Sequence, residues 1–212
     1  MPIQKESQKT KQAMATRLVK QKLWPALAAT VAEYFGHVVQ KARDENYPEI
    51  LYIHIDDSER LVQLFSGAHP VDVTHKRDKY GAKAGLQVHI EEGAALVVSQ
   101  STIGYPAIIL YPYKSQKQKR TCDHIIWKVF DSPKDITTRV LNTATKDFFT
   151  YMRVSSAVLA ESRLDRLRIR YLEFRGKKYS GEGGVSKFVF SHWFWGALGA
   201  VGSVASIYSL WK

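Results

Sequence analysis

The sequence has almost no cysteine: Cys122 is the one thiol among 212 residues. A lone thiol cannot form an internal disulfide, so nothing indicates an oxidising compartment. Cys122 lies close to Lys119, Arg120 and His124, and nearby cations can lower the pKa of a thiol. A nucleophile also needs a base and an orienting group beside it, and no motif supplies them. We therefore expect no catalytic cysteine.

The chain also lacks the short motifs of common enzyme classes. It contains no Gly-x-Ser-x-Gly, no His-Glu-x-x-His, no Walker loop and no dinucleotide fingerprint. The glycine-rich stretch 180–184 lacks the Gly-Lys-Ser/Thr ending of a phosphate-binding loop, which favours a linker. The sequence thus predicts no cofactor and no metal, and it does not favour an enzyme.

Residues 1–12 are polar and rich in lysine, and no apolar run follows them. A secretory signal needs such a run, so we expect the bulk of the protein to stay in the cytoplasm. We also expect residues 1–12 to be disordered. Hydrophobic residues make up 45% of the chain, enough to bury a core in the remainder.

Positive charge is present in excess. The formal net charge is +11 and the pI is about 9.6. Such a surplus favours polyanions, either nucleic acid or the anionic cytoplasmic leaflet of a membrane, although it can also serve solubility alone. Two basic clusters are candidate sites for an anionic partner. The first is Lys114, Lys117, Lys119 and Arg120, and the second is Arg163, Arg166, Arg168 and Arg170.

The longest apolar run spans residues 188–211 and holds no Asp, Glu, Lys or Arg. A helix needs roughly 20 such residues to cross the hydrocarbon core of a bilayer. Aromatic residues stand near both ends, as expected at membrane interfaces, and the basic residues lie mostly before the run. These features predict a single-pass, tail-anchored protein with a cytoplasmic N-terminal domain. An interfacial helix and a buried core helix are the alternatives.

Small residues recur at helical spacing within this segment. They are Gly196, Gly199, Ala200, Ser203 and Ser206. A stripe of small side chains lets helix backbones approach closely in lipid, so we expect homo-oligomerisation through it. Gly and Ser are also common in membrane helices in general, which is the simpler interpretation.

The preceding residues predict an α+β domain with an antiparallel or mixed sheet and helices on one face. The expected order is a helix to about residue 41 interrupted at Pro25, then short strands, then a helix starting at Ser132. The expected strands cover 50–55, 61–65, 86–90, 95–100, 107–111 and 124–130, with 86–90 and 95–100 forming a hairpin. Residues 159–174 fit a helix better than an edge strand. We expect the domain over residues 13–175 and a flexible linker over 176–187.

Two polar constellations are weaker candidates for chemistry. His54, Asp56 and Asp57 close a predicted strand, where acids can serve acid–base catalysis or form an ordinary turn. Residues His69, Asp72, His75 and Asp78 are of metal-ligand types at regular spacing. They fall in a stretch, 69–85, that reads as a polar loop, where such spacing says little about geometry.

Three functions remain open from the sequence. The first is a membrane-anchored effector or scaffold, antiviral or toxin-like, whose basic domain binds a partner and whose membrane helix self-associates. The second is a nucleic-acid-binding protein tethered to a membrane, and the third is a membrane-bound hydrolase or nuclease using the acids near residue 56.

Overall fold

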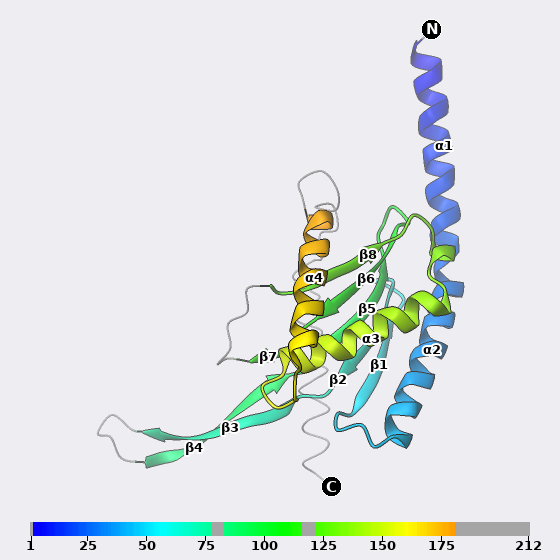
Figure 1. Cartoon of the computed structure of the whole chain (residues 1–212). Helices are drawn as coiled ribbons and strands as arrows, with labels where there is room; N and C mark the ends of the chain where they lie inside the picture. The colour runs from blue at the N-terminus through cyan, green and yellow to red at the C-terminus, as the bar shows by residue number, and fades with distance from the viewer. Residues whose placement is uncertain (1, 78–82, 116–121, 181–212) are drawn as a thin grey trace.

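The computed structural model describes residues 2–77, 83–115 and 122–180. Two helices open the chain: α1 (Pro2–Lys22) and α2 (Trp24–Asp44). They are separated at Leu23, as the proline at position 25 predicts, because proline suits the first turn of a new helix. Helix α1 extends beyond the rest of the domain (Figure 1), while α2 buries Trp24, Val31 and Phe35.

Residues 2–12 belong to α1, so the expectation of a disordered start is wrong. The physical reason is local. Residues 2–22 contain Lys, Gln, Ala, Met and Leu but no glycine, and these residues propagate a helix well once it is nucleated.

Five strands form the main sheet in the order β1-β2-β5-β6-β8, and every pairing is antiparallel. Their bounds are β1 (Leu51–Asp56), β2 (Leu61–Ser66), β5 (Ala95–Gln100), β6 (Pro106–Tyr111) and β8 (Ile125–Val129). The predicted strands at these places are confirmed. Between Ile108 and Ile109 the pairing with β8 shifts by one residue, which sets Trp127 in a bulge.

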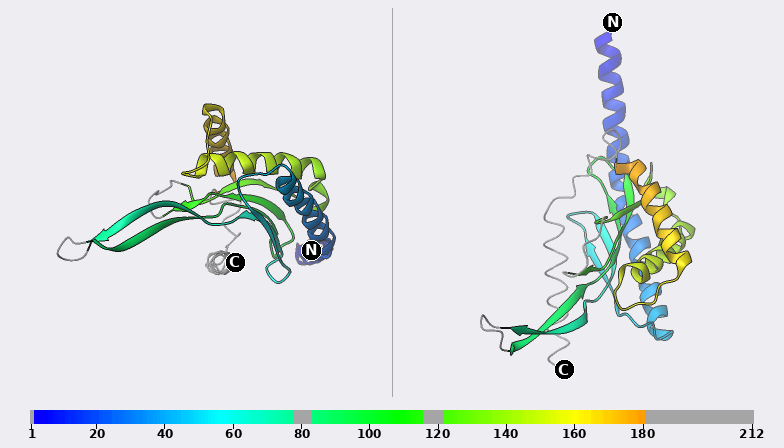
Figure 2. Two further views of the ribbon diagram at one scale, coloured as in Figure 1. Left: turned by 90° about the horizontal axis from the view of Figure 1, so that it is seen from below. Right: turned by 60° about the vertical axis from the view of Figure 1, so that its left-hand side comes forward.

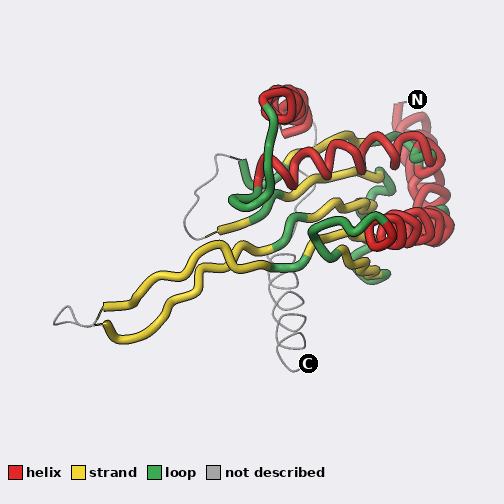
Figure 3. Tube along the Cα trace, turned by 60° about the horizontal axis from the view of Figure 1, so that its bottom comes forward, coloured by secondary structure: helices red, strands yellow, loops and turns green. Residues whose placement is uncertain are grey.

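A second, three-stranded antiparallel sheet is built from β3 (His69–Arg77), β4 (Lys83–Glu92) and β7 (Lys114–Ser115). Strands β3 and β4, here called the arm, project away from the main sheet (Figure 3). The predicted polar loop is therefore wrong for residues 69–77 and 83–85, while 78–82 lie outside the described residues. The predicted hairpin of 86–90 with 95–100 is also wrong. Alternation fixes which face a side chain takes, but it does not identify the partner strand.

The chain turns sharply between the arm and β5 at Gly93. A Cβ there would lie 1.8 Å from the carbonyl oxygen of Ser66, so only glycine fits. Ala94 completes the junction, because its N–H donates to Ser66 Oγ at 3.0 Å and its carbonyl accepts from the Ser66 N–H at 3.0 Å. These bonds carry the chain directly into β5.

Two further helices follow the sheets: α3 (Thr138–Ser155) and α4 (Arg163–Ser180). Ser132 and Asp135 do form a capping box, but it caps the short 3₁₀ helix η1 (Pro133–Asp135), and Thr137 caps α3. The preference for helix within 159–174 is confirmed. Helix α4 also includes residues 176–180, so this part of the expected linker is wrong; residues 181–187 lie outside the described residues.

Helices α2, α3 and α4 all pack on one face of the main sheet (Figure 2). Their apolar residues meet those of alternate strand positions, including Val62, Leu96, Ile108 and Leu110, to form the main core. The α+β class, antiparallel sheets and helices on one face are thus as expected. Segment 188–211, where the transmembrane helix is expected, lies outside the described residues.

The main sheet has a second apolar face, which we call the open face. Its members alternate with those of the main core along β2, β5 and β6. They are Leu61, Phe65, Ala95, Val97, Ala107, Ile109 and Tyr111, all buried. Half-buried Tyr52 and Val129 flank them on the outer strands.

Candidate functional site

Helix α4 is positioned by its inner side. Ser162 and Asp165 cap its start reciprocally, since each backbone N–H donates to the other's side chain at 3.1 Å. Ile169 and Leu172 are buried against the core. Near its end the helix approaches β8 so closely that a Cβ at Gly176 would lie 3.2 Å from the Ile126 carbonyl oxygen. The spacing 165, 169, 172 and 176 defines one helical face.

Ion pairs fasten α4 to α3. Arg153 donates to both carboxylate oxygens of Asp165, at 2.9 and 3.1 Å. This hydrogen-bonded guanidinium, together with the cap of Ser162, lowers the pKa of Asp165 from 3.8 to about 2. The pair therefore fixes the start of α4 as long as Asp165 is ionised.

A second ion pair lies deeper, around the buried carboxylate of Asp147. Arg168 donates to both of its oxygens, at 2.8 and 2.9 Å, and Trp127 Nε1 donates at 2.7 Å. Arg175 donates to the Trp127 carbonyl at 2.8 Å and lies over the indole ring. These contacts satisfy the carboxylate, and its hydrogen bonds raise the pKa of Arg168.

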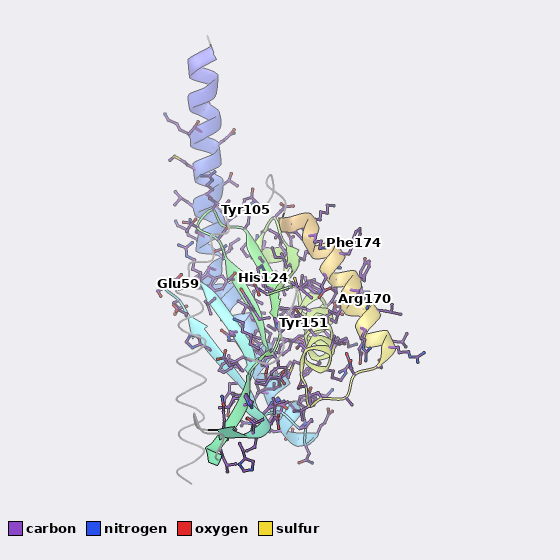
Figure 4. The ribbon with its side chains drawn as sticks, turned by 90° about the vertical axis from the view of Figure 1, so that its left-hand side faces the viewer. Glu59, Tyr105, His124, Tyr151, Arg170 and Phe174 are labelled. Carbon is purple, nitrogen blue, oxygen red and sulfur yellow. The ribbon has the colours of Figure 1, made fainter. Side chains whose placement is uncertain are left out.

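The side of α4 that faces away from the sheet is apolar. Leu164, Leu167, Tyr171 and Phe174, here called the outer stripe, are 76%, 59%, 53% and 77% exposed. At 3.6 residues per turn they fall within an arc of roughly 80°. Figure 4 shows Phe174 and Arg170 on the side of the helix turned away from the sheet. Contiguous exposed apolar groups of this kind mark a contact surface.

Basic residues line one edge of the outer stripe. Helix α4 carries seven Lys or Arg residues against two acids. Arg163 and Arg170 are exposed and form no ion pair within the described part of the chain, while Arg166 pairs with Glu161 at 2.6 Å on the surface. Of the predicted second cluster, the structure thus leaves Arg163, Arg166 and Arg170 facing solvent. Arg168 instead fastens the helix to Asp147.

The first predicted basic cluster is only partly described. Lys114 lies on β7, half-buried, and burial lowers its pKa despite nearby Glu92 and Asp123. Lys117, Lys119 and Arg120 lie outside the described residues. The structure therefore does not bring the two predicted clusters together as one described surface.

The acids that close β1 form a turn. Asp56 Oδ1 accepts hydrogen bonds from Ser58 Oγ at 2.6 Å and from the Glu59 N–H at 3.0 Å. These bonds lower the pKa of Asp56, with the hydroxyl of Ser58 as the largest cause. Asp57 is exposed beside them. Asp56 thus has the role of a turn-stabilising residue.

The regularly spaced His and Asp residues do not converge. Asp72 pairs with His89 in the arm and His75 with Leu86, which places them on opposite faces of the two-stranded ribbon. Asp78 lies outside the described residues. Across residues 2–77, 83–115 and 122–180, no group of three His, Cys, Asp or Glu side chains is placed to hold a metal ion.

His69 instead belongs to a buried junction that the sequence did not indicate. Its Nε2 lies 3.1 Å from Glu91 Oε2 and its Nδ1 lies 3.3 Å from Glu49 Oε2. Glu91 is fully buried, and it also accepts from Ser156 Oγ at 2.9 Å and the Ala157 N–H at 3.0 Å. The junction joins the root of the arm to the loop after α3. The sequence could not indicate this junction because it does not give the register of β3 and β4, which pairs His69 with Glu91.

Cys122 is half-buried, and its thiol donates to the His124 carbonyl oxygen at 3.1 Å. Burial raises the pKa of the thiol. Burial likewise lowers the pKa of His124, whose ring lies 5.7 Å from that of Tyr111 at the border of the open face. A protonated thiol beside a neutral imidazole gives this site no activated nucleophile.

Gly196, Gly199, Ala200, Ser203 and Ser206 all lie outside the described residues, so their predicted association stays a prediction. No helix in the described part of the chain combines the length and hydropathy that crossing a bilayer requires. In comparisons with protein families, with characterised proteins and with solved structures, no match to the chain was found.

Proposed function

We propose that this protein acts at a membrane. In this proposal helix α4 lies on an anionic lipid surface, and segment 188–211 spans the bilayer and self-associates through its small residues. The observation that carries the proposal is the outer stripe with its basic edge, on the helix that ends eight residues before the uncharged segment. No specific geometry supports the hydrolase alternative, since Asp56 is committed to its turn.

The energetics fit a peripheral contact reinforced by an anchor. Each Lys or Arg near an anionic surface contributes roughly 1 kcal/mol. Arg163, Arg166 and Arg170 could thus supply about 3 kcal/mol, and the outer stripe adds apolar burial at ~1.5–3 kcal/mol per fully inserted large side chain. Neither contribution alone gives stable anchoring, whereas two signals together do.

The test is flotation of the full chain with vesicles of neutral or anionic composition. We expect co-flotation with anionic vesicles, reduced by the double substitution Leu167→Ser and Phe174→Ser. Because both side chains are exposed, the variant should keep the parent's unfolding transition. The matched control is Val158→Ser, which removes an equally exposed apolar group that does not belong to α4.

Equal flotation of the parent and the double variant would remove α4 from the contact. Absence of any vesicle binding, combined with salt-dependent binding to single- or double-stranded nucleic acid, would favour the tethered nucleic-acid alternative instead. Protease protection of segment 188–211 in vesicles tests the span, and Gly199→Leu should reduce association of the inserted chains.

A further inference from the structure

The open face of the main sheet is apolar, and no described helix covers it. Its large apolar members are Leu61, Phe65, Val97, Ile109 and Tyr111. Helices α2, α3 and α4 lie over the opposite face (Figure 2), and no described helix packs on this one. An apolar sheet face that no described helix covers needs a partner, because its side chains would otherwise stand in water.

The surface is also chemically specific. Gln63 of β2 and Ser99 of β5 lie on the same face as the apolar members, and each is only 4% exposed. Within the described residues Ser99 Oγ has no hydrogen-bond partner. Buried hydroxyls are normally satisfied, so the cover should bring a polar group to this point. An uncharged segment with scattered hydroxyls would supply both the apolar contact and the polar group near Ser99.

We infer that segment 188–211 docks on the open face when the protein is in water. The segment has no formal charge and carries Ser203, Ser206 and Tyr208 among its apolar residues. Its small-residue stripe would allow a close approach to the sheet, as it would to another helix in lipid. In solution, docking would therefore shield from water the apolar side chains that the segment inserts into a membrane.

The lengths agree with this placement. Helix α4 packs against β8, the outermost strand, and ends at Ser180. Residues 181–187 can span up to about 23–25 Å when extended, enough to pass round the β8 edge. Five strands at about 4.8 Å spacing give a face roughly 20 Å wide, and 24 residues in helical conformation would measure about 36 Å. The segment is thus long enough to cross the whole width of the face.

The exchange of the segment between this face and a bilayer rests on the proposed function, whereas docking in solution does not. In water the segment would stabilise the domain, and in the presence of a membrane it would leave the face and insert. Such a population shift requires only that the membrane bind the segment better than the sheet does.

The test uses neighbouring residues that point to opposite faces of β8. In the full chain with Cys122→Ser, a cysteine replaces Val129, on the border of the open face, and a second cysteine is scanned through positions 196–206. The matched control replaces Lys128, which is exposed and pairs with Ile108 of the main core. Disulfide formation is measured in detergent-free buffer, and the intramolecular product is identified by mass spectrometry.

We expect at least one scanned position to give about ten-fold more intramolecular disulfide with position 129 than with position 128, since docking raises the effective concentration of the partner thiol. Circular dichroism confirms that each variant is folded. If a substitution at 129 unfolds the protein, Tyr52→Cys with Ile55→Cys as its control gives the same comparison on β1. Equal yields at paired positions, or no disulfide at all, would overturn the inference.

Anionic vesicles added to the cross-linking pair should lower its disulfide yield. Vesicle flotation without any disulfide in solution would refute docking while leaving the proposed function intact. Disulfide in solution without vesicle binding would refute the proposed function and leave docking intact.

Discussion

The two sides of helix α4 differ in how their charges and apolar groups are used. On the inner side Asp165, Ile169 and Leu172 are held by α3 and the core, and the arginine at 168 meets a buried carboxylate. On the outer side apolar groups are exposed, and Arg163 and Arg170 face water. The same residue types therefore serve stability on one side and remain available for contact on the other.

The largest effect should come from the inner apolar contact. Leu172 is fully buried, so Leu172→Ala should lower the free energy of unfolding by about 2–5 kcal/mol through lost burial and a residual cavity. Leu164→Ala, on the outer stripe, should change it by no more than about 0.5 kcal/mol. Urea unfolding measures both, and similar losses would contradict the division of α4 into two sides.

The next effect concerns the buried carboxylate. Asp147→Ala should cost about 2–3 kcal/mol, at or below the usual range for breaking a buried pair because Arg168 is partly exposed. It also leaves Trp127 Nε1 without its acceptor, so the tryptophan emission should change. Asp57→Ala, at an exposed acid, is the control. An unchanged unfolding midpoint for Asp147→Ala would show that the pair contributes nothing.

A smaller effect is expected from the outer arginines, and on binding alone. Arg163→Gln with Arg170→Gln should weaken binding to anionic vesicles by about 2 kcal/mol, or roughly 30-fold, at low salt. The unfolding transition should remain that of the parent. Arg168→Gln should do the reverse, lowering stability first. Vesicle titrations paired with thermal melts distinguish the two outcomes. Equal effects of substitutions at 168 and 170 on both binding and stability would refute the difference between the two sides of α4.

The smallest effect is a dependence on pH. Folding lowers the pKa of Asp165 from 3.8 to about 2, chiefly through the hydrogen bond from Arg153. A depressed pKa gives stability that is fully present above pH 3.8 and is lost as the pH falls towards 2. Asp165→Asn should therefore remove part of the acid sensitivity between these values, measured as the difference in unfolding midpoint between parent and variant. Identical slopes would contradict this role of the ion pair.

The sequence predicted the elements of the main sheet better than their pairing. Short apolar runs between turn residues located β1, β2, β5, β6 and β8, because strands buried on both faces, such as β5 and β6, appear in the sequence as continuous apolar stretches. Of the arm, the sequence predicted a strand at 86–90 but missed β3, because residues 69–77 are largely polar and resembled a loop. Partner choice depended on Gly93, whose close approach to Ser66 is visible only in three dimensions.

For the candidate site, the sequence predicted which residues take part but not which way each of them faces. The sequence located the arginines of α4, yet it could not show that Arg168 and Arg175 turn inwards while Arg163 and Arg170 do not. That distinction depends on which helical face the sheet and α3 occupy. The helix within 159–174 was likewise predicted without its orientation, because periodicity alone cannot separate an inner face from an outer one.

The arm has a consequence for how the domain could be shortened or extended. Phe65 of β2 pairs directly with Ala95 of β5, so the main sheet is continuous without residues 67–94. The arm is in effect an insertion into a simple five-strand meander, placed where a short hairpin turn would otherwise suffice. Its length and sequence can thus change independently of the sheet, provided that a replacement turn restores what Glu91 now gives to Ser156 and Ala157.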